Sequence, residues 1–186
     1  MAARGLLVFK TILYALLVAN VGTFLIVDPE PHRAIDQLGW LLLLGVFEYE
    51  TRLLRRGAVQ TVLRPAPLAV ELTGYACALY ALAHYIAQRD SIEIANSVTW
   101  LAISVMIWID ILAPVEGGSR GFRWRSAAKS LLYTLTFVWA AIWGWRGSLL
   151  DFFDAGLWIL CFFVIELNIL RLEGLTSRVA AAAQRG

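Results

Sequence analysis

The sequence predicts an all-α fold, an integral membrane bundle of six transmembrane helices with both termini on the cytoplasmic side. The first observation is composition: 60% of the residues are hydrophobic and 16% are charged, whereas soluble domains are about half apolar and a quarter charged. The second is a set of six apolar segments, each close to the roughly 20 residues that a helix needs to cross about 30 Å of hydrocarbon. The third is the placement of the basic residues.

The six apolar segments are separated by breaks that contain Pro, Gly or charged residues. Only the break from Trp145 to Ser148 is short enough to predict a tight antiparallel hairpin. The first segment follows Lys10, as the apolar part of a signal peptide would, but it lacks a convincing small-x-small cleavage site. We therefore interpret it as a retained anchor, with a cleaved signal as the alternative. The predicted spans are 11–27, 37–54, 68–87, 94–113, 130–145 and 149–170.

Neighbouring spans are expected to pair into hairpins within one transmembrane domain that covers residues 1–186. The predicted hairpins are 8–56, 66–114 and 128–172, and a short cytoplasmic tail follows at 173–186.

The Lys and Arg residues set the predicted orientation. Of the 16 in the chain, all but Arg33, Arg89 and Arg146 fall on the same side as the N-terminus if there are six crossings. Cytoplasmic loops carry an excess of Lys and Arg. We therefore expect a multi-pass protein of a bacterial inner membrane with both termini in the cytoplasm.

A repeat of about 60 residues relates the hairpins. Trp and Tyr gather at membrane interfaces in any case, so convergence is the alternative to duplication. A true repeat predicts a ring of three hairpins around a pseudo-threefold axis. The positions that the repeat pairs include Asp36, Asn96 and Asp154; Trp40, Trp100 and Trp158; Tyr14, Tyr75 and Tyr133; and Glu48 with Glu166.

Five carboxylates lie inside the apolar spans, all in the predicted cytoplasmic half: Glu48, Glu50, Glu71, Asp110 and Glu166. A charge at mid-membrane costs at least about 2.5–3.5 kcal/mol, so such residues face the bundle interior, a partner or water. One interpretation is a polar layer that binds a cation or proton, with Glu48 and Glu166 as its centre. The alternative is structural ion pairing, for which the spacing of Glu48 and Arg52 is favourable.

The first hairpin resembles the first two helices of the voltage-sensor domain of voltage-gated cation channels over residues 9–56. The matching residues are Phe9-Lys10-Thr11 through Ala19-Asn20, Asp36, and Val46-Phe47-Glu48-Tyr49-Glu50-Thr51-Arg52-Leu53. The rest of the family's pattern is missing. A sensing helix enters from outside, whereas the basic run that includes Arg120, Arg123 and Lys129 leads from the predicted cytoplasmic side into an outward-going helix. No selectivity-filter segment is present either, so the resemblance does not extend to voltage sensing.

Catalytic and metal-binding motifs are missing from the sequence. It has no Gly-x-Ser-x-Gly, His-Glu-x-x-His or P-loop pattern. With two Cys and two His residues, we expect no metal site, no cofactor and no enzyme activity. A haem or pigment held through His84 is the alternative to a hydrogen-bonded histidine near the membrane interface. No nucleic-acid partner is expected.

Two main function hypotheses follow, and an enzyme acting on lipid is a third. The first is a protein that conducts, or regulates the movement of, a cation or proton through a carboxylate-lined bundle. The second is a non-catalytic accessory or assembly subunit, whose aromatic faces support a homo-oligomer or a larger membrane complex. In either case a basic loop suits the anionic headgroups of the lipid bilayer at the cytoplasmic face, or an acidic partner. Its residues are Arg120, Arg123, Arg125 and Lys129.

Overall fold

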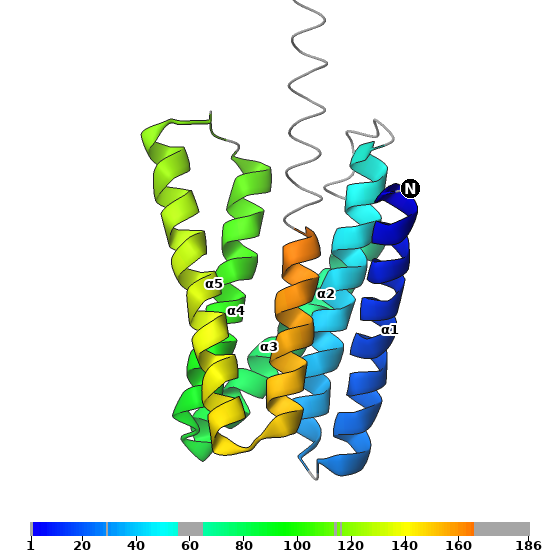
Figure 1. Cartoon of the computed structure of the whole chain (residues 1–186), viewed down its shortest axis with the longest axis vertical. Coiled ribbons are helices and arrows are strands. Elements are labelled where there is room, and N and C mark those ends of the chain that lie inside the picture. Colours follow the sequence, from blue (N-terminus) through cyan, green and yellow to red (C-terminus); the bar gives the residue numbers. More distant parts are fainter. Residues whose placement is uncertain (1, 29, 56–64, 114, 116, 166–186) are drawn as a thin grey trace, which may run out of the picture.

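A computed structural model describes residues 2–28, 30–55, 65–113, 115 and 117–165. Within these residues the chain forms six helices and no strand. Successive helices run in opposite directions, and the sixth stands between α2 and α5 (Figure 1). The helices are α1 (Ala2–Val27), α2 (Pro31–Arg55), α3 (Pro65–Gln88), α4 (Ser91–Leu112), α5 (Arg120–Arg146) and a sixth, unlabelled helix at 149–165.

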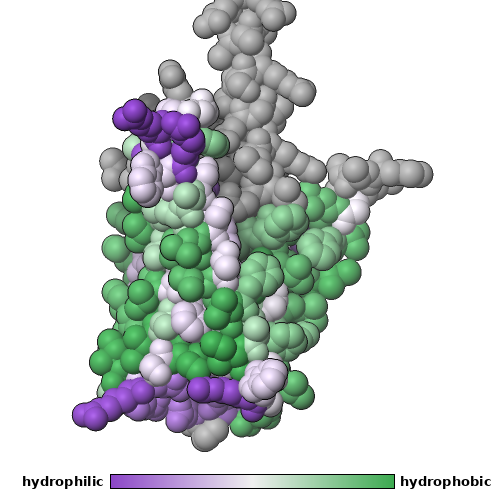
Figure 2. All heavy atoms as spheres, turned by 60° about the vertical axis from the view of Figure 1, so that its left-hand side comes forward, coloured by the Kyte–Doolittle hydropathy of each residue, from purple (hydrophilic) through white to green (hydrophobic). Residues whose placement is uncertain are grey.

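Three of the six helices are long and apolar enough to cross a membrane: α1, α3 and α4, over Gly5–Val27, Pro65–Gln88 and Ser91–Asp110. α2 carries more charges, α5 mixes basic residues with Trp and Tyr, and the described part of the sixth helix ends at residue 165. A broad hydrophobic surface separates hydrophilic side chains at the two ends of the molecule (Figure 2). The all-α fold with six helices is thus confirmed, and the three apolar helices indicate a membrane protein. Six crossings remain a prediction.

Three short turns lie at one end of the bundle, which we name the short-loop end. They join α1, which ends at Val27, to α2, which begins at Pro31; α3 to α4 through residues 89–90; and α5 to the sixth helix through residues 147–148. The prediction that only the last break is tight was therefore wrong. Two helices begin earlier than the apolar spans predicted for them: α2 begins at Pro31 in place of 37, and α4 begins at Ser91 in place of 94. Polar residues before each apolar span belong to the helix, because they pair with other side chains inside the bundle.

Local backbone chemistry explains how two of these turns close. The Asp90 side chain accepts hydrogen bonds from the backbone N–H groups of Ile92 and Glu93, at 3.1 and 3.2 Å, and so caps α4. Arg89 before it adopts a left-handed conformation with φ 58°. Gly147 ends α5 with φ 78°, a conformation that glycine adopts without steric cost.

The centre of the bundle is built by α2, α4 and the sixth helix, and we refer to the line between them as the axis. Trp40, Trp100 and Trp158, one from each helix, meet there and form the Trp layer. The ring centroids of Trp40 and Trp100 are 6.4 Å apart, as are those of Trp40 and Trp158. These tryptophans are the ones that the predicted repeat pairs, so the paired positions occupy equivalent places around the axis. A common origin of the hairpins stays a prediction.

α2 and α3 approach closely through two glycines. A Cβ atom on Gly39 would lie 2.8 Å from the carbonyl oxygen of Gly74, and one on Gly74 would lie 2.9 Å from the carbonyl oxygen of Gly39. Small residues at such crossings let helix backbones touch, which is how helices in membranes gain packing energy. The contact fixes α3 against the outer side of α2.

Candidate functional site

The first element of the site is a cluster of charges just inside the short-loop end, which we name the Arg33 layer. Arg33 of α2 donates hydrogen bonds through Nη2 to Glu93 Oε1 of α4 at 2.5 Å and to Asp151 Oδ1 of the sixth helix at 2.6 Å. Its Nη1 lies 3.3 Å from Asp28 Oδ2. One guanidinium therefore joins all three helices that surround the axis.

One helical turn further in lies the Asp36 layer, formed by Asp36, Asn96 and Asp154. Asp154 accepts hydrogen bonds from Asn20 and Gln37, both at 2.6 Å. The buried Asn96 Oδ1 has no hydrogen-bond partner among the described residues. The layer combines two carboxylates with an amide oxygen, and all of these groups accept hydrogen bonds or coordinate cations.

Asp36 is held by two donors. Its carboxylate accepts hydrogen bonds from Trp40 Nε1 at 3.1 Å and from the Tyr85 hydroxyl at 3.4 Å. Tyr85 is buried, with an exposed fraction of 3%. Because neither donor carries a positive charge, the hydrogen bonds fix the carboxylate without neutralising it.

A cavity of about 30 Å³ lies between these two layers, which is room for about one water molecule. Asp36, Glu93, Asp151 and Asp154 line it, and among the described residues the one basic side chain in its lining is that of Arg33. Four carboxylates against one guanidinium leave an excess of acidic groups in a partly buried space. Such an excess is costly unless protons or cations enter.

The Trp layer closes this polar region toward the middle of the bundle. Trp40 donates to Asp36, and Trp158 Nε1 donates to Gln37 Oε1 at 2.8 Å. Gln37 in turn donates to Asp154. Trp40 is therefore hydrogen-bonded to the Asp36 layer directly, and Trp158 is connected to it through Gln37.

Glu48, one of the two residues predicted as the centre of the site, is buried in an ion pair. Lys10 of α1 donates to Glu48 Oε1, and the Tyr14 hydroxyl donates to the same oxygen at 2.7 Å. Glu48 thus forms an ion pair, as the structural alternative expects, and its partner is Lys10. The side chain of Arg52 lies outside the described residues, and so does Glu166.

Asp110 is also held in ion pairs. Its carboxylate lies 2.9 Å from Lys129 Nζ and 3.4 Å from Arg125 Nη1, so these two basic residues bind an internal carboxylate. The predicted basic loop is itself helical, because the Ser119 hydroxyl caps α5 and the helix starts at Arg120. Arg120 and Arg123 instead flank a surface hollow beside Trp124. Binding of anionic headgroups stays a prediction.

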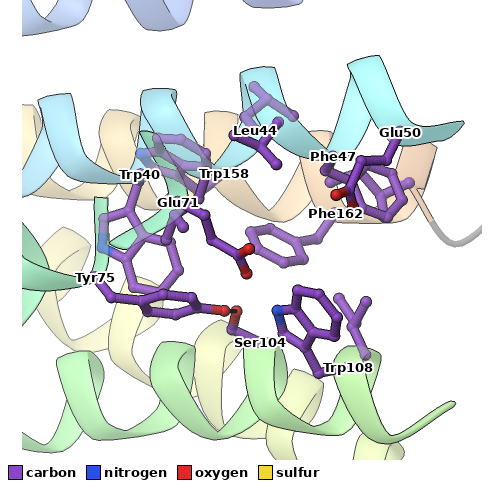
Figure 3. Close-up of a pocket in the computed structure, with 14 residues that line it drawn as sticks. Trp40, Leu44, Phe47, Glu50, Glu71, Tyr75, Ser104, Trp108, Trp158 and Phe162 are labelled. Carbon is purple, nitrogen blue, oxygen red and sulfur yellow. Dashed lines mark hydrogen bonds between the residues drawn. The ribbon is translucent and has the colours of Figure 1, made fainter. Parts of the chain in front are cut away.

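Glu50 and Glu71 line a second cavity, of about 70 Å³, on the other side of the Trp layer (Figure 3). A polar layer of five carboxylates stays a prediction, because Glu166 lies outside the described residues. Glu48 pairs with α1, Asp110 pairs with α5, and only Glu50 and Glu71 share a space. Glu48 and Glu50, two residues apart on α2, thus have different neighbours, which sequence position alone does not reveal.

The Arg33 and Asp36 layers were not predicted as a site, although a signal for them was present. The repeat register had paired Asp36, Asn96 and Asp154, and residues three positions earlier give Arg33, Glu93 and Asp151. They were missed because they lie at the polar edges of the apolar spans, where charged residues look like loop residues.

His84 lies near the same end of the bundle. Its Nδ1 is 3.1 Å from the carbonyl oxygen of Tyr80, and its ring stacks on that of His32 with the centroids 5.1 Å apart. The hydrogen-bonded alternative for this histidine is therefore the one that the geometry favours.

No family model, curated protein or solved structure matches the chain. The resemblance of residues 9–56 to voltage-sensor domains accordingly stays a prediction.

Proposed function

We propose that this protein conducts a cation or proton across the membrane, or regulates its movement, along the axis between α2, α4 and the sixth helix. The observation that supports this most is the cavity at the axis lined by four carboxylates and one guanidinium. Carboxylates inside a membrane bundle are rare and costly, and they mark ion pathways and proton relays.

The proposal includes an orientation. The chain crosses a bacterial inner membrane six times with both termini in the cytoplasm, which puts the short-loop end outside. An ion from outside then meets the Arg33 layer first and the Asp36 layer second. The aromatic cavity with Glu50 and Glu71 lies on the cytoplasmic side of the Trp layer.

The Trp layer is the barrier in this pathway. Trp40 and Trp158 line both the space beneath the Asp36 layer and the cavity with Glu50 and Glu71. Rotation of these indoles would connect the two spaces. Since Trp40 donates to Asp36, protonation or cation binding at Asp36 weakens the hydrogen bond that holds the indole in place. The site thus couples occupancy to opening.

Asp36 and Asp154 replace Glu48 as the central residues of the proposal, because Lys10 already compensates the charge of Glu48. The accessory-subunit hypothesis is the alternative, and the experiment described next distinguishes the two.

The experiment measures proton and monovalent cation flux into proteoliposomes that contain the purified chain. We expect wild-type flux above that of empty liposomes, and at least a tenfold reduction for Asp154→Asn and for Asp36→Asn. Glu30→Gln is the matched control, because Glu30 lies at the same end but is 46% exposed; its flux should equal that of wild type. Wild-type protein without flux, together with a membrane partner that co-purifies in fixed ratio, would favour the accessory role.

A further inference from the structure

The second cavity, which we name the aromatic cavity, is a separate space with its own chemistry. It lies between α2, α3, α4 and the sixth helix, on the side of the Trp layer away from the short-loop end (Figure 3). Its volume is about 70 Å³. Aromatic rings from all four helices form its walls: Trp40, Phe47, Tyr75, Trp108, Trp158 and Phe162.

Two carboxylates belong to this aromatic lining. Glu71 has an exposed fraction of 9%, and its carboxylate points into the space between Tyr75, Phe162 and Trp108 (Figure 3). Glu50 of α2 is the second. No Lys, Arg or His is among the residues that line the cavity. The cavity therefore carries negative charge on apolar walls, with no cation of its own in the described part of the chain.

The two lysines of the chain pair with other carboxylates. Lys10 pairs with Glu48, and Lys129 pairs with Asp110. Glu71 occupies the position in α3 that Lys10 and Lys129 occupy in α1 and α5 when Tyr14, Tyr75 and Tyr133 are aligned. The middle hairpin thus has a carboxylate where the other two have an ammonium group. Among the described residues, that exchange leaves the two carboxylates of the cavity without a basic side chain.

The walls determine which cation fits. A divalent metal ion needs several oxygen ligands, but the remaining oxygens here are the Tyr75 hydroxyl and Ser104 Oγ, which are hydrogen-bonded to each other at 2.6 Å. The faces of Trp, Tyr and Phe instead attract alkylated ammonium groups, which lose little hydration on entering such a site. A carboxylate then balances the charge in an environment of low dielectric constant.

We propose that the aromatic cavity binds a small organic ammonium ion, with its N-methyl or N-alkyl groups on the indole and phenyl faces and its charge beside Glu71 and Glu50. The apolar part of the ligand lies along Leu44 and Ile107, which complete the wall. This inference does not depend on ion movement along the axis, because binding requires only the folded bundle.

The test uses two molecules of nearly equal shape, choline and its uncharged isostere 3,3-dimethylbutan-1-ol. Purified full-length protein in detergent is titrated with each, and binding is followed by quenching of tryptophan fluorescence and by the shift in thermal denaturation temperature. We expect saturable binding of choline and at least tenfold weaker binding of the alcohol. Equal affinities for the two molecules, or no binding of choline, would overturn the proposal.

Variants locate the site. Glu71→Gln should weaken choline binding at least tenfold while leaving the affinity for the alcohol unchanged, and Trp108→Leu should weaken choline binding several-fold. If Glu71→Gln fails to fold, Glu50→Gln replaces it, because the Glu50 side chain is only half-buried. The affinities for choline and for the alcohol are then compared in the same way. Glu30→Gln at the short-loop end is the control and should bind as wild type does. Unchanged choline affinity in folded Glu71→Gln or Glu50→Gln protein would contradict the assignment.

Failure of this proposal is distinguishable from failure of the proposed function. Choline binding without flux would leave the cavity assignment intact and remove the ion pathway. Flux without choline binding would leave the ion pathway intact and remove the cavity assignment.

Discussion

At the scale of single residues, the charges inside the bundle divide into compensated and uncompensated groups. Glu48 and Asp110 each face a lysine, at distances that define ion pairs, so their role is to hold α1 against α2 and α5 against α4. Asp36 and Asp154 accept hydrogen bonds from neutral donors. Carboxylates are therefore compensated by lysines in one part of the bundle and held by neutral donors in another.

The ion pair of Lys10 and Glu48 makes the first prediction. Lys10→Met leaves the buried Glu48 carboxylate without its ammonium partner, and breaking one side of a buried pair costs about 3–5 kcal/mol. We expect a lower thermal denaturation temperature in detergent for Lys10→Met. The double variant Lys10→Met, Glu48→Gln should regain most of the loss, because no buried charge is then left alone. A double variant as unstable as Lys10→Met would mean that the pairing is not what stabilises the contact.

At the scale of helices, the close approach of α2 and α3 depends on two glycines. Gly39→Ala would place a methyl group 2.8 Å from a backbone carbonyl oxygen, which cannot move as a flexible side chain can. Overpacking of this kind costs about 1–3 kcal/mol. We expect Gly39→Ala to lower the denaturation temperature by several degrees, which circular dichroism on heating would detect.

Gly45 provides the control on the same helix. A Cβ atom there meets nothing within 4 Å, so Gly45→Ala should be neutral or slightly stabilising, since alanine is the better helix former. Equal losses for both variants would contradict the assignment of the Gly39→Ala loss to the close contact with α3.

Helix number could be predicted from the sequence because apolar length is a strong signal, and the register between hairpins could be predicted because Asp36 and Trp40 recur with the same spacing. The helix starts could not. Arg33 and Glu93 look like loop residues until their partners, which come from other helices, are known. The same limit applies to the site: sequence position showed that Glu48 is buried, but not that Lys10 lies beside it.

At the scale of the whole molecule, the proposed topology predicts which ends are accessible from each side of the membrane. In a background of Cys77→Ser and Cys161→Ala, Gln88→Cys at the short-loop end should react with an impermeant maleimide in intact cells. Val115→Cys, at the other end, should react only after permeabilisation. Both residues are exposed. Labelling of both from the same side would contradict the six-crossing topology.

Three layers follow one another along the axis. The Arg33 layer gathers charge, the Asp36 layer holds acidic groups for which Arg33 is the basic residue among the described lining, and the Trp layer lies between the Asp36 layer and the aromatic cavity. If this order is functional, the tryptophans limit the rate and the aspartates are required for passage.

The most direct measurement of this claim is ion flux in proteoliposomes for Trp100→Ala, alone and combined with Asp154→Asn. Trp100 belongs to the Trp layer but is not hydrogen-bonded to Asp36 or Gln37 in the described structure, so its removal opens the barrier while leaving the acidic groups in place. We predict flux several-fold above wild type for Trp100→Ala and flux near that of empty liposomes for the double variant. Equal flux in wild type, Trp100→Ala and the double variant would contradict a pathway along the axis.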